Sequence, residues 1–298
     1  MGGSDDSHEF GSEDITETKL RLVEEYLKAY AIALRGKFRQ LWYIDAFAGT
    51  GSRTVRHGAT PSNMFNDETP ERVEKRRGSA RIALDVEPKF DRLVFMEQRK
   101  KHFEALMALK GQHPDRYISV VRGDANKLIQ KEIKWDGWKS TRAVIFLDPY
   151  GMNVEWETLQ AIAATKSIDV WFLFSIEGLY RQAARDIKNV DETKRAAITR
   201  QLGTDEWESQ LYQAKPSQAN LFGDIATSET QRIADVKGLE AYVTARLKTL
   251  FPLVMKPFPL PLNKRPQRFS LYFALSNNEP KAIGLATRIA NHILASGN

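Results

Sequence analysis

Short apolar runs alternate with helical patterns over much of the chain. The runs predicted to be strands lie at residues 41–47, 93–96, 117–121, 143–147 and 169–176. The segments predicted to be helices between them lie at residues 79–86, 101–109, 125–133 and 156–164. Strands that are apolar along their whole length and are separated by helices are typical of a parallel sheet buried on both faces. The pattern therefore predicts an α/β fold.

The last part of the chain predicts two further strands and a helix. A Pro-rich stretch at residues 252–266 is expected to contain one strand, and residues 268–276 alternate between apolar and polar positions. A closing helix is predicted over residues 280–294. Two late strands before a helix indicate a hairpin that adds an antiparallel last strand to a mostly parallel, seven-stranded sheet.

Two segments depart from the alternation of strands and helices. Residues 1–13 are rich in Gly, Ser and Asp and are predicted to be flexible, before a helix that begins near Asp14. Residues 178–250 have a polar, helical pattern without a convincing strand, and we interpret them as a helical insert or lid. The main domain is therefore predicted to consist of residues 14–177 and 251–298.

A basic stretch at residues 53–77 also lacks apolar periodicity. Arg53, Arg56, Arg76 and Arg77 lie in it among Thr, Pro, Asn, Asp and Glu residues. We predict a long mobile loop, because loops of this length inside compact domains are usually functional or disordered. Its arginines are candidate contacts to a substrate, although a solvated basic face would have the same composition.

The composition narrows the possible functions. A net charge of +6 and a pI of about 9.3 suit a polyanionic partner such as nucleic acid. The absence of Cys excludes disulfides, thiolate metal ligands and Cys nucleophiles, and the five His residues show no metal-binding spacing, so no metal is predicted. No apolar run is long enough to cross a membrane, and the polar N-terminus lacks the apolar segment of a secretory signal. We expect a cytoplasmic protein.

The most informative motif is a Gly-rich turn that follows the first predicted strand. Its sequence is Asp45-Ala46-Phe47-Ala48-Gly49-Thr50-Gly51. A Gly-x-Gly turn at the end of a strand lets a ligand approach the backbone closely. Asp45, at the strand end, can accept a hydrogen bond from an ammonium group or a water molecule. Alone, the motif would also fit a dinucleotide site or a tight turn.

Polar residues also follow the next three predicted strands. Glu97 and Gln98 end the second strand, where a carboxylate can bind both hydroxyls of a ribose. Asp124 and Ala125 follow the third strand, where Asp124 can bind an adenine amino group or act as a helix cap. Asp148 ends the fourth strand. Because ligands of open α/β sheets bind at the carboxyl ends of the strands, these residues are predicted to converge on one crevice.

NAD is the main alternative cofactor. Its fingerprint, Gly-x-Gly-x-x-Gly, opens directly into a helix, whereas Gly51 is followed by Ser52, Arg53 and the basic stretch. A Walker phosphate loop is absent as well. The segment from Phe47 to Gly51 resembles the S-adenosylmethionine (SAM) loop of nucleic-acid amino-methyltransferases. SAM is therefore the predicted cofactor.

Most of the chain resembles the three-Cys-motif partner protein family (TcmP), which is predicted to be methyltransferase-like. The segments that carry the resemblance are residues 8–11, 16–20, 26–30, 43–51, 78–79, 147–151 and 202–207, together with Glu97 and Asp124. The layout is similar, more distantly, to a bacterial ribosomal-RNA adenine-N6 methyltransferase family. The resemblance implies a Rossmann-like, SAM-dependent methyltransferase fold.

The same resemblance implies partners and substrate contacts. The family is named for neighbouring proteins with a three-cysteine motif like that of radical-SAM enzymes, so such a protein is a candidate partner. Lys19 lies in the family-like opening segment and is a candidate contact to cofactor or substrate, although it could also be solvated on the first helix.

Asp148, Pro149 and Tyr150 are the predicted catalytic residues. Amino-methyltransferases end the fourth strand with Asp/Asn-Pro-Pro-Tyr/Phe. In that motif the side-chain oxygen and the first Pro carbonyl accept hydrogen bonds from the target amine, and the aromatic ring stacks on the flipped base. Here the second Pro is missing, so Tyr150 stands one position early and Gly151 takes the aromatic position. Tyr150 either stacks on a base or packs in the core.

The sequence therefore favours a SAM-dependent methyltransferase that acts on an exocyclic amine of a nucleic-acid base, with adenine N6 preferred. Two other functions stay open. The chain could methylate a protein or a small molecule. It could also be a non-catalytic SAM-binding partner of a radical-SAM-like three-Cys-motif protein, which the altered Pro-Pro motif would suit.

Overall fold

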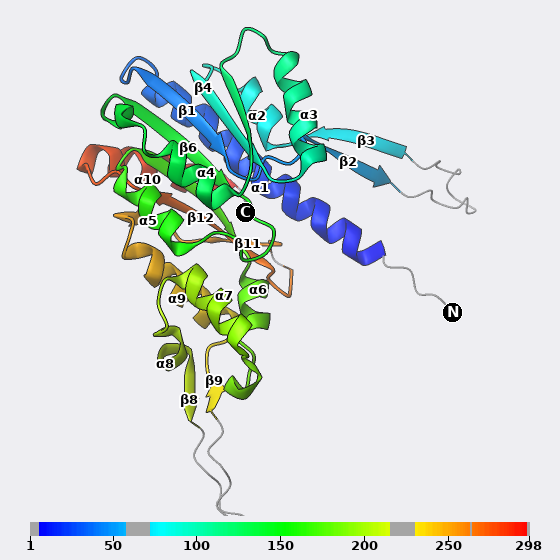
Figure 1. The fold of residues 1–298 in the computed structure, drawn as a ribbon, viewed down its shortest axis with the longest axis vertical. Helices are drawn as coiled ribbons and strands as arrows, with labels where there is room; N and C mark the ends of the chain where they lie inside the picture. The colour runs from blue at the N-terminus through cyan, green and yellow to red at the C-terminus, as the bar shows by residue number, and fades with distance from the viewer. Residues whose placement is uncertain (1–5, 58–71, 215–229, 263, 297–298) are drawn as a thin grey trace, which may run out of the picture.

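A computed structural model describes residues 6–57, 72–214, 230–262 and 264–296 of the chain. Its centre is a mixed sheet in which the neighbouring strands follow the order β5-β4-β1-β6-β7-β12-β10, and β11 also pairs with β12 (Figure 1). The bounds of the first five strands in chain order along this path are Gln40–Asp45 (β1), Arg92–Glu97 (β4), Ile118–Arg122 (β5), Thr141–Leu147 (β6) and Ile168–Phe174 (β7).

The directions of the strands match the predicted hairpin at the end of the chain. Strands β5, β4, β1, β6 and β7 are parallel to one another. Strand β12 (Phe269–Leu275) runs antiparallel to β7, while β10 (Leu253–Val254) and β11 (Phe258–Leu260) run antiparallel to β12. The α/β class, the mostly parallel sheet and its antiparallel last strand confirm the predicted Rossmann-like methyltransferase fold.

The sheet is buried on both faces, which explains why its strands are apolar throughout. In β12, Leu271 and Phe273 belong to the hydrophobic cluster on one face, whereas Tyr272 and Ala274 belong to the cluster on the other face. Burying one such large side chain contributes about 1.5–3 kcal/mol. The helices that supply the first cluster are α1 (Asp6–Leu34), α2 (Ser79–Asp85), α3 (Lys100–Gly111) and α10 (Pro280–Ser296).

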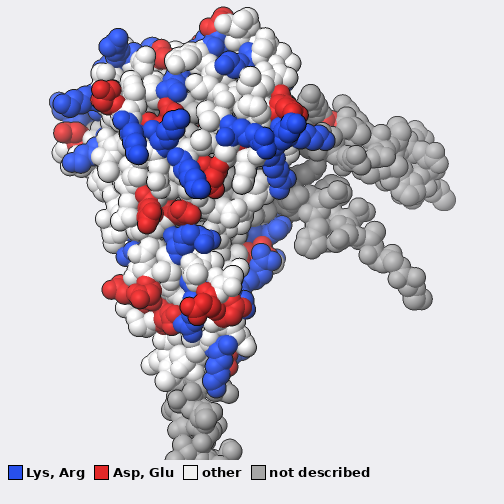
Figure 2. Space-filling view, viewed as in Figure 1, with Lys and Arg blue, Asp and Glu red and all other residues white. Residues whose placement is uncertain are grey.

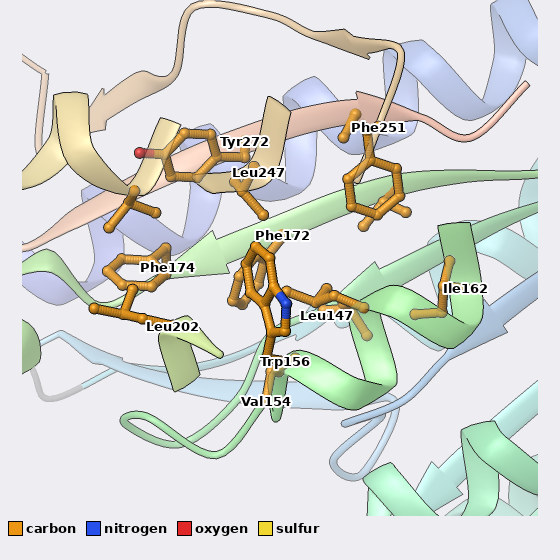
Figure 3. Close-up of a cluster of buried hydrophobic side chains, with 14 of the residues drawn as sticks. Leu147, Val154, Trp156, Ile162, Phe172, Phe174, Leu202, Leu247, Phe251 and Tyr272 are labelled. Carbon is orange, nitrogen blue, oxygen red and sulfur yellow. The ribbon is translucent and has the colours of Figure 1, made fainter. Parts of the chain in front are cut away.

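The second face is covered by helices from the centre of the chain and from the segment interpreted as an insert. These helices are α4 (Ala125–Glu132), α5 (Trp156–Ala164), α6 (Ile176–Gln182), α7 (Glu192–Leu202), α8 (Trp207–Leu211) and α9 (Val236–Lys248). Figure 3 shows Leu202 of α7 and Leu247 of α9 in one cluster with Phe172, Phe174 and Tyr272 of the sheet. The segment thus shares the core of the sheet.

Three segments differ in structure from the sequence predictions. Helix α1 already begins at Asp6, within the stretch predicted to be flexible. The basic stretch 53–77 is not simply a loop, because β2 (Ser52–His57) and β3 (Arg72–Arg77) form an antiparallel hairpin, while residues 58–71 lie outside the described residues. The insert is not purely helical, because β8 (Tyr212–Ala214) pairs with β9 (Thr230–Arg232).

Both hairpins escaped the sequence analysis for a physical reason. Strands of a two-stranded arm do not belong to a buried sheet, so their sequences need no continuous apolar run. Strands β2 and β3 are dominated by charged residues, and β8 and β9 are three residues long each. As to membranes, none of the described helices is long and apolar enough to span one.

Candidate cofactor and substrate site

The turn after β1 has the backbone conformation that its glycines predict. Gly49 has a φ of +59° and Gly51 a φ of +71°, values in the left-handed region that other residues rarely adopt. A Cβ atom at Gly49 would meet no atom within 4 Å, so the backbone there is open to an approaching ligand. The N–H of Gly78, directly before α2, donates to the carbonyl oxygen of Gly51 at 3.0 Å and holds the end of the turn.

Asp45 lies beneath this turn and is fully buried. Its carboxylate accepts hydrogen bonds from the Phe47 N–H and from the Tyr43 hydroxyl, both at 3.3 Å. Burial raises the pKa of Asp45 to about 7; the Asp148 charge also raises it, against hydrogen bonds that lower it. Asp45 does not line either cavity described below, so its contact with a cofactor stays a prediction.

Glu97 connects the end of β4 to the Gly turn. Its Oε2 accepts a hydrogen bond from the Gly49 N–H at 3.0 Å, and its Oε1 accepts one from the Arg99 N–H at 2.8 Å. These two hydrogen bonds hold the Glu97 side chain in place. Because each carboxylate oxygen can accept a second hydrogen bond, Glu97 can still bind hydroxyl groups.

His102 was missed by the sequence analysis. Its Nδ1 lies 3.7 Å from Oε2 of Glu97 and, among the described residues, has no hydrogen-bond partner. A single His in the first turn of a basic helix has no recognisable motif spacing, and only the fold brings it to Glu97.

Asp124 caps a helix and also lines a cavity. Its Oδ1 accepts a hydrogen bond from the Lys127 N–H at 3.1 Å, which makes it the N-cap of α4. Its side chain also lines the same cavity as Glu97. The cap positions the carboxylate and does not remove it from the crevice.

Two neighbouring cavities lie at the carboxyl ends of the parallel strands. The first has a volume of about 410 Å³, and its lining includes Thr16, Lys19, Phe47, Ala48, Gly49, Thr50, Gly51, Asp148, Pro149, Tyr150 and Gly151. The second has a volume of about 360 Å³, and its lining includes Phe47, Glu97, Gln98, Arg99, Asp124, Ala125 and Tyr150. Phe47 and Tyr150 line both cavities, so the predicted cofactor residues and the predicted catalytic residues adjoin.

Lys19 of α1 forms an ion pair with Asp148 at the end of β6. The Lys19 side chain is 10% exposed and that of Asp148 is 25% exposed. The pair connects the N-terminal helix to the predicted catalytic carboxylate. Removing either partner would leave a largely buried charge without compensation, which is costly. The sequence singled out both residues but could not pair them, because they are 129 positions apart.

Tyr150 does not pack in the core, which excludes one of the two predictions made for it. It is 57% exposed, and the Arg99 guanidinium lies 4.6 Å from its ring centroid in a cation–π contact. Gly151, which follows, has a φ of +67°, so the turn needs Gly at the position where related motifs carry an aromatic residue. The ring of Tyr150 therefore remains available at the junction of the two cavities.

The predicted substrate-binding arginines lie on the β2–β3 hairpin. Arg76 forms ion pairs with Glu17 and Glu74. The register places Arg53 opposite Arg76, but the side chains of Arg53 and Arg56 are outside the described part of the structure. The hairpin projects beside the N-terminal half of α1 (Figure 1).

Arg77, at the base of the hairpin, forms ion pairs with Glu24 of α1 and Asp85 of α2. Figure 2 shows Lys and Arg side chains gathered near this base, with Asp and Glu side chains between them. Arg76 and Arg77 thus hold the hairpin against the domain, a role that the sequence did not indicate. Within the described residues, no group of three or more His, Asp or Glu side chains is placed to hold a metal ion.

Comparisons with known proteins give only distant similarities. No protein-family model matches the sequence, and no curated protein matches it. Among solved structures, a DUF519-family protein from Legionella pneumophila has a TM-score of 0.40 at 14% identity, covering 78% of this chain and 91% of that one. Spermidine synthase from Thermotoga maritima has a TM-score of 0.38 at 13% identity, covering 88% and 62%. A SAM-dependent methyltransferase from Clostridium acetobutylicum has a TM-score of 0.37 at 9% identity, covering 85% and 91%.

Proposed function

We propose that this chain is a SAM-dependent methyltransferase that acts on an exocyclic amine of a nucleic-acid base, with adenine N6 preferred. The observation that carries the proposal is the junction of the two cavities at Phe47 and Tyr150. A cofactor lying along the Gly turn and Glu97 would end beside Asp148, Pro149 and Tyr150. That is the arrangement that direct transfer between two bound molecules requires.

The residues of the second cavity suit the adenosine part of SAM. Glu97 would accept hydrogen bonds from the ribose hydroxyls, and Asp124 one from the adenine amino group. Gly49 leaves the backbone of the turn open, so the methionine part can extend into the first cavity. When bound, SAM supplies a sulfonium-activated methyl group that is transferred to a nucleophile.

The residues of the first cavity suit an amine acceptor. A carboxylate oxygen of Asp148 and the carbonyl oxygen of Pro149 would accept the two N–H bonds of an exocyclic amine and so aim its lone pair at the methyl group. The Lys19 ammonium, paired with Asp148, fixes the orientation of that carboxylate. The exposed ring of Tyr150 would stack on the target base, and Arg99 would hold the ring.

A nucleic-acid partner is supported by charge near the site. The chain has a net charge of +6, and the β2–β3 hairpin, with six Arg or Lys residues in its two strands, stands beside α1, which carries Lys19. Phosphate contacts from such arms provide affinity without reading sequence.

The alternative of a non-catalytic SAM-binding partner of a radical-SAM-like three-Cys-motif protein, as in the family that the sequence resembles, keeps one supporting observation. In this structure Lys19 already occupies one oxygen of Asp148, the carboxylate proposed to hold an acceptor amine. Turnover decides between the two functions.

The test is methyl transfer from radiolabelled SAM by the purified full-length chain to protein-free RNA and DNA. We expect label in a base amine, lowered at least about 100-fold by Asp148→Ala, because both acceptor geometry and charge are lost. Asp136→Ala, which removes an exposed carboxylate away from the site, is the matched control. SAM binding without any transfer would contradict the enzymatic proposal, and label found only in protein would contradict the nucleic-acid acceptor.

A further inference from the structure

A third cavity, of about 900 Å³, lies at the opposite edge of the sheet from the candidate site. It is bordered by α1, by α10 and by the first residues of β6 and β7, where Arg142 and Asp169 are located. It shares no lining residue with the two cavities of the candidate site. Its volume is in the range of small-molecule sites, and its wall is mainly apolar.

The inner wall of this cavity contains polar groups that the fold does not fully use. Asp169 is 7% exposed, and its Oδ2 accepts a hydrogen bond from the Tyr26 hydroxyl at 2.5 Å. The hydroxyl of Tyr30, which is 3% exposed, has no hydrogen-bond partner among the described residues. A buried polar group without a partner costs about 1–3 kcal/mol, so a ligand that supplied one would recover that cost.

The mouth of the cavity is positively charged. Lys37 of the segment after α1, and Lys281 and Arg288 of α10, are exposed, line the cavity and form no ion pair with a described residue. Glu279 is the acidic residue among them, so cations outnumber acids at this rim. Arg142, deeper in the wall, donates hydrogen bonds to the carbonyl oxygens of Trp138 and Thr141.

We propose that this cavity binds a small organic anion that has a ring body and an N–H or O–H donor at its inner end. The anionic group would lie near Lys37, Lys281 and Arg288, and the ring body against the apolar wall. The donor would reach the free acceptor positions of Asp169, while the Tyr30 hydroxyl gains a partner. A ligand with a cationic end is disfavoured, because it would have to pass three unpaired cations. The inference does not rest on the proposed methyltransferase function.

The probe for the test is 6-hydroxynaphthalene-2-sulfonate, a fluorescent anion whose sulfonate and O–H donor lie at opposite ends of two fused rings. Titration of the full-length chain, followed by fluorescence, is expected to show one saturable site. Excess S-adenosylhomocysteine should leave that site occupied, because the cavity is separate from the candidate cofactor site. Displacement by S-adenosylhomocysteine, or the absence of saturable binding, would overturn the proposal.

Three variants assign the probe to the cavity. Arg288→Glu should weaken binding by about fivefold or more, because it reverses a charge at the mouth of the cavity. Lys110→Glu, a charge reversal at an exposed residue of α3, should leave binding unchanged. Tyr30→Phe should weaken binding by about threefold while the thermal stability is kept or raised, because a buried hydroxyl without a partner is removed.

The third variant, Gly284→Phe, should abolish binding by filling the cavity. A Cβ at Gly284 meets no atom within 4 Å, and the position is helical, so the variant is expected to fold. Thermal unfolding of each variant checks this expectation. Probe affinity that is the same in the wild type, Arg288→Glu, Tyr30→Phe and Gly284→Phe would overturn the assignment.

Discussion

The buried carboxyl group of Asp45 is predicted to make the stability of this fold depend on pH. Burial raises its pKa from the ordinary value of 3.8 to about 7. Between these values the folded state holds a proton that the unfolded state has lost, so the free energy of unfolding falls as the pH rises. One pKa unit corresponds to about 1.4 kcal/mol, so the whole interval corresponds to roughly 4 kcal/mol. Above pH 7 the loss is complete.

Asp45→Asn keeps the shape of the side chain and removes its titration. Relative to the wild type, the variant should gain about 2.7 kcal/mol of unfolding free energy between pH 5 and pH 8, since about two pKa units of the interval lie in that range. Urea unfolding of both proteins at pH 5, 6, 7 and 8 measures this difference. Burial also raises the pKa of Asp169 to about 7. This group titrates in both proteins, so its contribution cancels in the difference between them.

The exposed carboxyl of Asp136 provides the control. Asp136→Asn should follow the wild-type pH profile, because it leaves the buried carboxyl group of Asp45 in place. Parallel profiles for the wild type and Asp45→Asn, or a relative loss of stability by Asp45→Asn toward pH 8, would refute the reasoning.

Three further outcomes are expected from the contacts described above. In a double-mutant cycle of unfolding free energies, Lys19→Met and Asp148→Asn should be coupled by about 1–3 kcal/mol, because the pair is largely buried; additive costs would contradict the pair. Trp207→Ala should lower the free energy of unfolding by about 3–5 kcal/mol, because its ring is fully buried. Unfolding should remain one cooperative transition, because the ring belongs to the core of the sheet; a separate early transition would contradict the shared core. Arg99→Met should lower methyl transfer more than SAM affinity, because it releases the Tyr150 ring; equal losses would contradict that role.

The sheet could be predicted from the sequence because its burial leaves a direct trace. Strands covered on both faces, such as residues 168–174, must be apolar at nearly every position. The helices that connect successive parallel strands must cross a face of the sheet, so strand and helix patterns alternate along the sequence. The β2–β3 hairpin leaves no such trace, because charged residues occupy strands that no second layer covers. Helix α1 began earlier than predicted, because residues 6–13 lack the apolar periodicity on which the predicted start at Asp14 depended.

The candidate site was predictable at the level of strand ends but not at the level of contacts. The positions of Glu97, Asp124 and Asp148 follow from strand order, since parallel strands end at one edge. The depth of Asp45 and the pairing of Lys19 with Asp148 depend on how α1 crosses the sheet, and no local pattern encodes that crossing.

Cofactor binding tests the central claim most directly. Calorimetric titration of the full-length chain with S-adenosylhomocysteine should show one site. Glu97→Ala should weaken that site at least about tenfold, because hydrogen bonds from the ribose to a charged group are lost. Glu104→Ala, which removes an exposed acid from α3, the helix that follows β4, should leave the affinity unchanged. Absence of saturable binding by the folded wild type, or equal affinity in Glu97→Ala, would contradict a SAM site at the carboxyl edge of this sheet.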